Sequence, residues 1–233
     1  MDLLTVHGVS KQFGVRAVLH QVGFRVQQGE VLGLIGPNGA GKTTLFECLA
    51  GLSPDDGGKV GFRQQTLPAA RRKEALFYLP DGIAPWAAQS VQWALGFFEK
   101  LYAGPIKAAT LAAELKLEHL LASRIGSLSK GERKRLLLAL GLLTPQPLLM
   151  LDEPFDGLDL RQTREVMALL RQHAEGGRTL MLSIHQLNDA ARVCDRLVLL
   201  SEGCVVGEGS IDELRELAKL KDGGLEEIFL ALT

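Results

Sequence analysis

The segment "GPNGAGKT", from Gly36 to Thr43, holds the residues whose spacing most clearly predicts a chemistry. It matches G-x-x-x-x-G-K-[ST], a pattern that binds polyphosphates when an apolar strand precedes it and a helix follows. The glycines let backbone N–H groups converge on phosphate oxygens, and the helix N-terminus adds a favourable dipole. We expect Lys42 to reach the β- and γ-phosphates and the Thr43 hydroxyl to bind Mg²⁺. The residues predicted to contact the nucleotide here are Gly36, Pro37, Asn38, Gly39, Ala40, Gly41, Lys42, Thr43 and Thr44.

Two adjacent carboxylates in "LLMLDEP" supply a second part of a phosphoryl-transfer site. Asp152 ends an apolar run typical of a buried strand, where its carboxylate can hold Mg²⁺. Glu153 comes next, and we expect it to point the other way from the strand end and to polarise the attacking water. A helix cap would also explain an isolated Asp-Glu pair, and a glycine-rich turn with a chance lysine would explain the first motif. The two motifs together favour nucleotide hydrolysis.

Three further motifs allow both a structural and a functional interpretation. His185 follows the apolar run in "MLSIHQ", where it either contacts a γ-phosphate or makes a structural hydrogen bond. Asp159 ends "FDGLD" and is a site residue, the N-cap of the next helix, or both. "LSKGE" is typical of a helix start, with Ser129 as the N-cap and Glu132 as the third helical residue of a capping box.

The segments that position these motifs alternate between strands and helices. "VLGLIG", "LLMLD" and "TLMLS" are continuous apolar runs, typical of strands buried on both faces, and helical patterns follow them. Alternation in the first thirty residues predicts antiparallel strands, with one side formed by Val18, His20, Val22, Phe24 and Val26. Strands alternating with helices favour an α/β fold whose sheet is mainly parallel.

Between residues 84 and 147 no strand pattern is present, and apolar residues recur at helical spacing. We therefore expect a single domain over 1–233. It consists of an α/β nucleotide-binding core (1–83 and 148–233) of the P-loop NTPase type, with an N-terminal antiparallel β part, and an inserted all-helical subdomain (84–147).

Composition excludes several classes of protein. The 233 residues are 46% hydrophobic and 23% charged, with a net charge of −1, which is ordinary for a globular chain and argues against nucleic-acid binding. The cluster "RRK" at 71–73 is interpreted as a solvated helix face. Cys48, Cys194 and Cys204 lack metal-ligand spacing and are interpreted as reduced, buried thiols. The longest apolar run is too short to span a bilayer, so we expect the chain not to cross a membrane.

Strand, P-loop, helical insertion, "LSKGE", "LLMLDEP", "GLD" and His185 occur in this order, and the chain thereby resembles the ATP-binding subunits of ABC transporters. In that family the pentad is the signature motif. The resemblance implies a head-to-tail dimer in which Ser129 and Gly131 of one subunit face the γ-phosphate held by Lys42 of the other. It also implies that Asp159 lies at the dimer seam and that His185 is the switch histidine. Phe13 matches the aromatic residue that stacks on adenine, with core packing as the alternative.

Two positions depart from the family pattern. The signature has Lys130 where glycine is usual and Glu132 where glutamine is usual. Lys130 either adds positive charge near the phosphates or points to solvent. Asp81, in "FYLPDG", stands where the family usually carries glutamine. It either touches Mg²⁺ or the attacking water, or caps the turn "PDG". Since Lys42, Asp152, Glu153 and His185 are all present, we expect hydrolysis to be intact.

The resemblance implies an ATPase that uses ATP and Mg²⁺, pairs with a second copy of itself and acts through separate integral membrane permease subunits. It would sit in the cytoplasm, at the cytoplasmic face of the inner membrane. The C-terminal "GLEEIFLAL", "LSKG" and the acidic "YLPD" resemble ABC-2-type export subunits, which favours export. The alternatives are an import ATPase, a soluble ABC ATPase acting on ribosomes or DNA, and a nucleotide-binding regulator without turnover.

Overall fold

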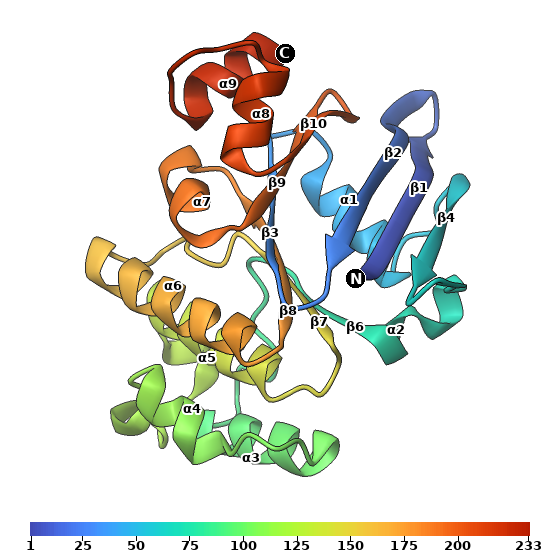
Figure 1. Cartoon of the computed structure of the whole chain (residues 1–233). Coiled ribbons are helices and arrows are strands. Elements are labelled where there is room, and N and C mark those ends of the chain that lie inside the picture. The colour runs from blue at the N-terminus through green and yellow to red at the C-terminus, as the bar shows by residue number, and fades with distance from the viewer.

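The computed structural model describes all 233 residues and is built around a six-stranded sheet in the order β10-β9-β3-β8-β7-β6 (Figure 1). All its strands run parallel except β10, which pairs antiparallel with β9 at one edge. The three predicted buried strands, β3, β8 and β7, are neighbours, and every residue in them is buried. The strand bounds are β3 Val31–Ile35, β6 Leu76–Leu79, β7 Leu148–Asp152, β8 Thr179–Ile184, β9 Arg196–Ser201 and β10 Cys204–Gly209. The predicted α/β fold with a mainly parallel sheet is confirmed.

A second, antiparallel sheet has the order β2-β1-β4-β5, with β1 Asp2–Phe13, β2 Arg16–Gln27, β4 Gly57–Phe62 and β5 Gln65–Thr66. The single side predicted for β2 is wrong for Val18 and His20: His20 is exposed and Val18 is half-buried, while Leu19 is buried between them. Gln21 adopts a left-handed backbone conformation, and the pairing of β1 with β2 shifts register around it. Such a β-bulge inverts the alternation of side chains, and a period-two pattern does not reveal it.

Helices fill the rest of the chain. Their bounds are α1 Lys42–Ala50, α2 Arg72–Ala75, α3 Val91–Tyr102, α4 Ala108–Glu114, α5 Lys130–Leu142, α6 Leu160–Glu175, α7 Leu187–Val193, α8 Ile211–Leu217 and α9 Leu225–Leu232. Between β6 and β7 the chain forms helices, turns and loops but no strand, and the helical subdomain over 84–147 stays a prediction. None of the helices combines the length and the apolarity that crossing a bilayer requires.

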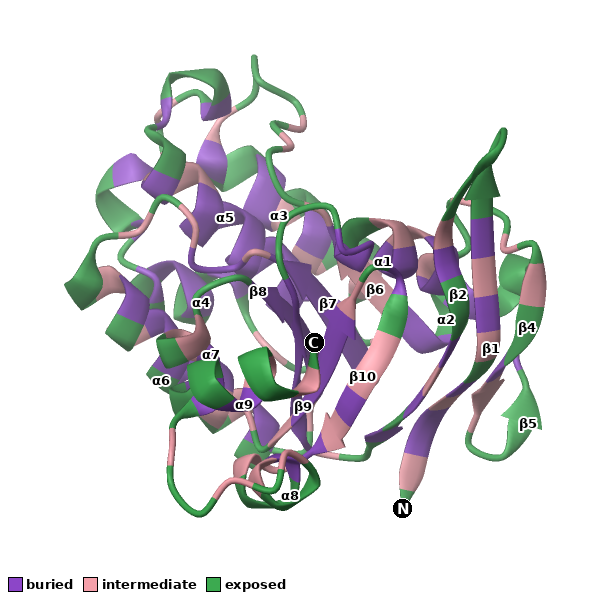
Figure 2. Cartoon of the chain, turned by 90° about the horizontal axis from the view of Figure 1, so that it is seen from above, coloured by how far each residue is buried: buried purple, intermediate pink, exposed green.

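The central sheet separates two hydrophobic cores. On β7, Leu149 and Leu151 pack into one core with the residues of α3 to α6, whereas Leu148 and Met150 pack into the other with α1 and the antiparallel sheet. Figure 1 shows these two layers on opposite sides of the sheet, and Figure 2 shows the buried residues concentrated between them. Because both faces are covered, polar groups gather at the strand ends, which is where open parallel sheets bind ligands.

Two sequence-based interpretations are corrected by burial. In "RRK", Arg71 and Lys73 are exposed, but Arg72 is only 5% exposed. Its guanidinium donates to the Cys48 carbonyl at the end of α1 and pairs with Asp55, so Arg72 joins α1 to α2 rather than facing solvent.

The cysteines also differ from one another. All three are free thiols, but only Cys48 is buried as predicted, and burial raises its pKa to about 11. Cys194 is half-buried and Cys204 is exposed, because Cys204 opens the edge strand β10.

Candidate active site

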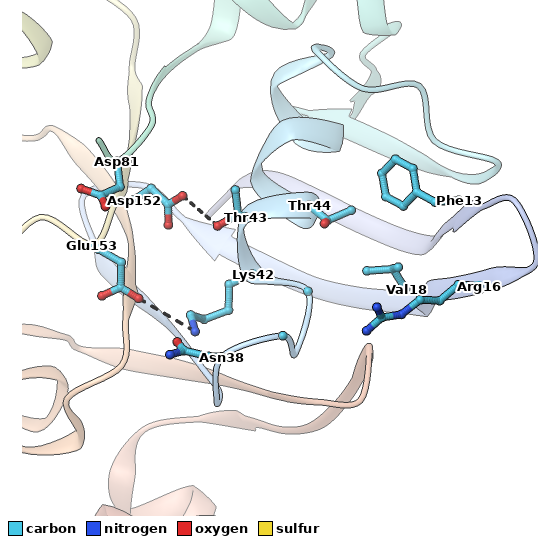
Figure 3. A pocket seen from close by; sticks show the side chains of 12 residues that line it. Phe13, Arg16, Val18, Asn38, Lys42, Thr43, Thr44, Asp81, Asp152 and Glu153 are labelled. Atoms are coloured by element: carbon cyan, nitrogen blue, oxygen red, sulfur yellow. Dashed lines mark hydrogen bonds and ion pairs between the residues drawn. The ribbon is translucent and has the colours of Figure 1, made fainter. Parts of the chain in front are cut away.

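A cavity of about 510 Å³ lies at the carboxyl ends of β3 and β7. The predicted site residues that line it are Phe13, Asn38, Gly39, Gly41, Lys42, Thr43, Thr44, Asp81, Asp152 and Glu153. Figure 3 shows an acidic end with Asp81, Asp152 and Glu153, a central loop with Lys42 and Thr43, and Phe13 at the far end. Residues far apart in the sequence are thus brought together at one edge of the sheet, with a lysine between them.

The central loop leads from β3 into the N-terminus of α1. Gly41 precedes this helix with φ of 104°, a left-handed conformation that favours glycine, and no side chain caps the helix. The first N–H groups of a helix have no partner within it, so those of α1 face outward and suit an anion. At Gly36 a side chain would collide with the Leu200 carbonyl, which explains why glycine stands there.

Lys42 lies over the loop and is 7% exposed. Its Nζ donates to the carbonyl oxygens of Gly36 at 2.8 Å and Pro37 at 3.3 Å, and lies 3.9 Å from Glu153 Oε1. Burial lowers the pKa of Lys42, and the charges of Glu153 and Asp152 act in the opposite direction. Gly36 and Pro37 do not line the cavity themselves, but their carbonyls position the Lys42 ammonium, which does line it.

Asp152 is the centre of a hydroxyl cluster and is 4% exposed. Its Oδ2 accepts hydrogen bonds from Thr43 Oγ1 at 3.0 Å and from Tyr78 Oη at 3.2 Å, and its Oδ1 accepts one from Ser183 Oγ. Burial and the nearby Asp152 raise the pKa of Tyr78.

A carboxylate next to a threonine hydroxyl forms a hard-oxygen donor set, which suits Mg²⁺. No cluster of three or more His, Cys, Asp or Glu side chains that could hold a metal exists in the structure. Mg²⁺ commonly uses one or two protein oxygens and completes its shell with phosphates and water, and Thr43 Oγ1 and Asp152 Oδ2 offer two such oxygens.

Glu153 does not point away from Asp152 as predicted, and both side chains line the same cavity. The reason is its backbone: φ is 47°, so the chain leaves strand geometry at this residue. Its Oε2 lies 2.5 Å from His185 Nδ1, and its Oε1 faces Lys42. His185, although exposed at 44% of its side chain, thus joins the site through Glu153.

Asp81 lines the acidic end of the cavity, but its closest partner is one that neither sequence interpretation named. Its Oδ1 accepts a hydrogen bond at 2.5 Å from Nζ of Lys134, a residue of α5. The same ammonium donates to the backbone carbonyl of Glu153 at 2.9 Å. The turn "PDG" has Gly82 at φ of 70°, as expected for a turn.

Phe13 ends β1 and is 52% exposed at the rim of the cavity, so the core-packing alternative is wrong. Arg16 and Val18 of β2 line the same end of the cavity and were not predicted. The hairpin that carries all three was recognisable from the sequence, but which of its side chains face the loop depends on how the antiparallel sheet packs on α1.

Ser129, Gly131 and Asp159 do not line this cavity and lie at the starts of α5 and α6. Ser129 and Asp159 are exposed N-caps of α5 and α6, each within a capping box. The predicted reciprocal bonds of the first box are present: Ser129 Oγ accepts from the Glu132 N–H at 3.3 Å, and Glu132 Oε2 accepts from the Ser129 N–H at 2.8 Å. A side chain at Gly131 would contact the Gly157 carbonyl at 2.8 Å, so the two helix starts lie against each other.

The Lys130 side chain is 63% exposed, as in the solvent-facing alternative, but its ammonium is paired. Its Nζ pairs with Asp156 Oδ2 at 2.6 Å, which ties the start of α5 to the segment before α6. This pair lowers the pKa of Asp156 and raises that of Lys130.

Three residues around the acidic end were missed in the sequence: Tyr78, Ser183 and Lys134. Ser183 had a usable signal, because it is the polar residue in an otherwise apolar strand, next to its carboxyl end. Tyr78 and Lys134 had none, since an amphipathic strand and a basic helical residue are ordinary features.

Comparison with known proteins places the chain in a family. Residues 19–156 match the model of the ABC transporter family. The chain is 34% identical over 214 residues to the Nod factor export ATP-binding protein I of Bradyrhizobium diazoefficiens, covering 89% of this chain and 70% of that protein. It is 33% identical over 225 residues to the doxorubicin resistance ATP-binding protein DrrA of Mycobacterium tuberculosis, covering 92% and 68%. A solved ATP-binding subunit of an ABC transporter superposes with a TM-score of 0.89 at 30% identity, over 99% of both chains.

Proposed function

The chain belongs to the family of ABC transporter ATP-binding subunits and is an ATPase, and from this premise we propose that it drives export through separate membrane subunits. Export is supported by the names of the relatives, which concern Nod factor export and doxorubicin resistance. The single observation that carries the proposal is the juxtaposition of Lys42, Asp152 and Glu153 in one cavity beside an uncapped helix N-terminus. We place the subunit at the cytoplasmic face of the membrane, where ATP is available.

We propose the following role for each group in the cavity. ATP lies with its phosphates on the residues of the loop from Gly36 to Thr44 and its adenine toward Phe13. Lys42 neutralises the β- and γ-phosphates. Thr43 and Asp152 would hold Mg²⁺, which would supply positive charge to offset the negative charge of the phosphates. Glu153 accepts a hydrogen bond from the attacking water and so orients it. His185 holds the Glu153 carboxylate and contacts the γ-phosphate.

Two copies complete each site. Ser129 and Asp159 are exposed, Gly131 is buried between them, and all three lie outside the cavity of their own chain, where the Ser129 hydroxyl and the helix N-termini suit an anion. In a head-to-tail homodimer these residues cover the γ-phosphate bound to Lys42 of the other copy. Hydrolysis then removes the group that both copies bind, and the dimer opens.

An aromatic surface is the proposed contact with the membrane subunit. Trp86, Trp93 and Phe97 are each 40–42% exposed, and the rings of Trp93 and Phe97 stack at 5.2 Å. Exposed apolar patches of this kind mark interaction sites, and Trp86 lies on the segment that begins at Asp81. A coexpressed permease subunit should therefore copurify with the wild-type chain but not with the Trp93→Ala variant. The wild-type chain and the variant should both hydrolyse ATP.

The dimer and its chemistry are tested with Glu153→Gln. The amide cannot accept the water proton as the carboxylate does, so MgATP should convert this variant from monomer to a stable dimer in size-exclusion chromatography. Adding Ser129→Asp keeps an N-cap but places a negative charge opposite the γ-phosphate, and the dimer should disappear. Retained binding of a fluorescent ATP analogue shows that the cavity is intact. Unchanged turnover in Glu153→Gln would refute the role of Glu153, and a dimer in the double variant would refute the role of Ser129.

A further inference from the structure

Lys134 is a buried cation at the centre of three elements of the site. Its side chain is 5% exposed, against 35% for its partner Asp81. From the second turn of α5 its ammonium reaches Asp81 Oδ1 at 2.5 Å and the Glu153 carbonyl at 2.9 Å. A buried ammonium is retained only where acceptors compensate its desolvation, and here both acceptors belong to the edge of the nucleotide cavity.

The contact to Glu153 is made at an unusual backbone position. Glu153 has φ of 47°, in the left-handed region, which costs roughly 1–3 kcal/mol for such a residue unless the surroundings hold it. Its N–H donates to Ser183 Oγ at 3.0 Å, and its carbonyl accepts from Lys134. The Glu153 carbonyl also accepts from the Asp156 N–H at 3.2 Å, so Lys134 adds a bond from another element to a local turn. In this conformation the Glu153 side chain lines the cavity together with Asp152.

The contact to Asp81 does something different. Asp81 lines the cavity next to Asp152, so three carboxylates would otherwise repel one another there. By binding Asp81, the ammonium neutralises one of them and holds the start of the segment that leads to Trp86. The same charge therefore fixes two groups that are 72 positions apart in the sequence, Asp81 and Glu153.

We propose that Lys134 is a positioning residue for hydrolysis: it holds Glu153 in its productive conformation and makes that conformation depend on the position of Asp81. Asp81 is then a partner of Lys134 rather than a ligand of Mg²⁺. When the segment from Asp81 to Trp86 moves, the hydrogen bond between Asp81 and Lys134 changes. The position of Lys134 then changes the orientation of the Glu153 carboxylate. The inference rests on the proposed function, since it concerns ATP turnover at the same site.

The first test is a double-mutant cycle on ATP turnover by the full chain, with Lys134→Met, Asp81→Asn and both together. Lys134→Met keeps the aliphatic stem and removes the charge, and kcat should fall roughly ten- to a hundredfold, because small displacements of a catalytic group are costly. KM for ATP should stay within about twofold, since the phosphate-binding groups are unchanged. Asp81→Asn should cost less, because its amide oxygen still accepts from Lys134. The double variant should be no slower than Lys134→Met, as expected for residues that act together.

Two further variants separate positioning from a general structural role. Lys134→Arg retains a cation and should recover part of the lost kcat. Lys116→Met removes an exposed lysine that is also paired with a carboxylate, Glu165, and should leave kcat unchanged. The dependence on free Mg²⁺ should be equal in the wild type and in Asp81→Asn.

A second readout does not depend on turnover. The chain has two tryptophans, Trp86 and Trp93, so in a Trp93→Phe background the emission reports on Trp86 alone. Lys134→Met should shift this emission, because it removes the partner of Asp81. Asp81→Asn should shift it in the same direction but less, because the uncharged amide oxygen keeps a weaker bond to Lys134.

Several results would overturn the inference. They are a kcat of Lys134→Met within twofold of the wild type, additive losses in the double variant, or an Mg²⁺ requirement raised by Asp81→Asn alone. If the wild-type chain has no turnover, the proposed function fails instead. The link between Asp81 and Lys134 is then tested by the emission of Trp86 alone. If Asp81→Asn and Lys134→Met shift this emission in opposite directions, the link is excluded.

Discussion

Two cavities of nearly equal volume lie at opposite ends of strand β7. The nucleotide cavity, about 510 Å³, is at its carboxyl end, and a second cavity of about 520 Å³ lies at its amino end. We call the latter the distal cavity; it is lined by polar residues that include Gln146, His173 and Arg178. Both cavities contain a cation with a pKa lowered by burial: Lys42 in the first, and Arg178, lowered to about 10, in the second.

The difference lies in what the polar groups bind. Arg178 donates to the carbonyl and hydroxyl of Thr144 and to the Gly141 carbonyl, so its charge satisfies the last turn of α5. Lys42 holds two loop carbonyls too, but it also faces Glu153 across open space beside an uncapped helix N-terminus. Cavity volume therefore does not identify a functional site, whereas polar groups converging on a common point do. Helix α5 connects the two cavities. Lys134 near its start binds groups at the edge of the nucleotide cavity, and the Gly141 carbonyl near its end accepts a hydrogen bond from Arg178 in the distal cavity.

The largest expected effect is on ATP turnover, and it distinguishes Lys42 from Arg178. Lys42→Ala should lower ATP turnover by at least about a hundredfold, because it removes the charge that stabilises the transferred phosphate. The free energy of unfolding should change by no more than about 1 kcal/mol, since a desolvated cation and its bonds are lost together. Steady-state phosphate release and urea unfolding measure the two quantities. A large loss of stability without loss of turnover would reverse the comparison.

Arg178→Met should give the opposite result. The last carbonyls of α5 and the buried Thr144 would lose their donor, at a cost of about 2–3 kcal/mol in the free energy of unfolding. kcat and KM should stay within about twofold of the wild type. Arg164→Met, a change at an exposed arginine of α6, is the matched control and should alter stability by less than about 0.5 kcal/mol. Loss of turnover in a folded Arg178→Met protein would show that the distal cavity takes part in the reaction.

Substitutions at Ser129, the N-cap of α5, should change both ATP turnover and stability. Ser129→Ala removes the N-cap and should cost about 1 kcal/mol of stability, together with a loss of turnover. Ser129→Asp retains a capping oxygen, so thermal unfolding should remain near that of the wild type while turnover still falls. If Ser129→Asp hydrolyses ATP normally, the residue is only a cap.

The smallest expected effect concerns pH. Burial, with the charge of Arg178, lowers the pKa of His173 below its usual 6.5, so the folded protein favours the neutral ring. Its contribution to stability is then fully present above pH 6.5 and is lost as the pH falls toward the lowered value, because the unfolded chain takes up the proton first. His173→Gln should flatten this part of the pH dependence of thermal unfolding. An unchanged slope would mean that the ring is accessible to protons in the fold.

Much of the site was predictable because its motifs are local. The loop from Gly36 to Thr43 and the capping box of Ser129 and Glu132 involve atoms within a few residues of one another, so spacing alone predicts their geometry. The register of β2 was not predictable, since one bulge at Gln21 inverts its sides. The burial of Arg72 was missed for a related reason: its partners are Cys48 on α1 and Asp55 in the loop after α1, both distant in sequence.

The amino-acid sequence by itself determined the family, the α/β fold and the residues proposed to bind a nucleotide, because apolar runs and glycine spacing are properties of the chain. The tertiary structure alone decided that Glu153 turns into the cavity beside Asp152, that Phe13 stays exposed at its rim, and that Lys134 binds Asp81. Each of these depends on which elements lie side by side, and packing rather than local preference sets that arrangement. Ser183 and Tyr78 joined the site in the same way, through strands that meet at one edge of the sheet.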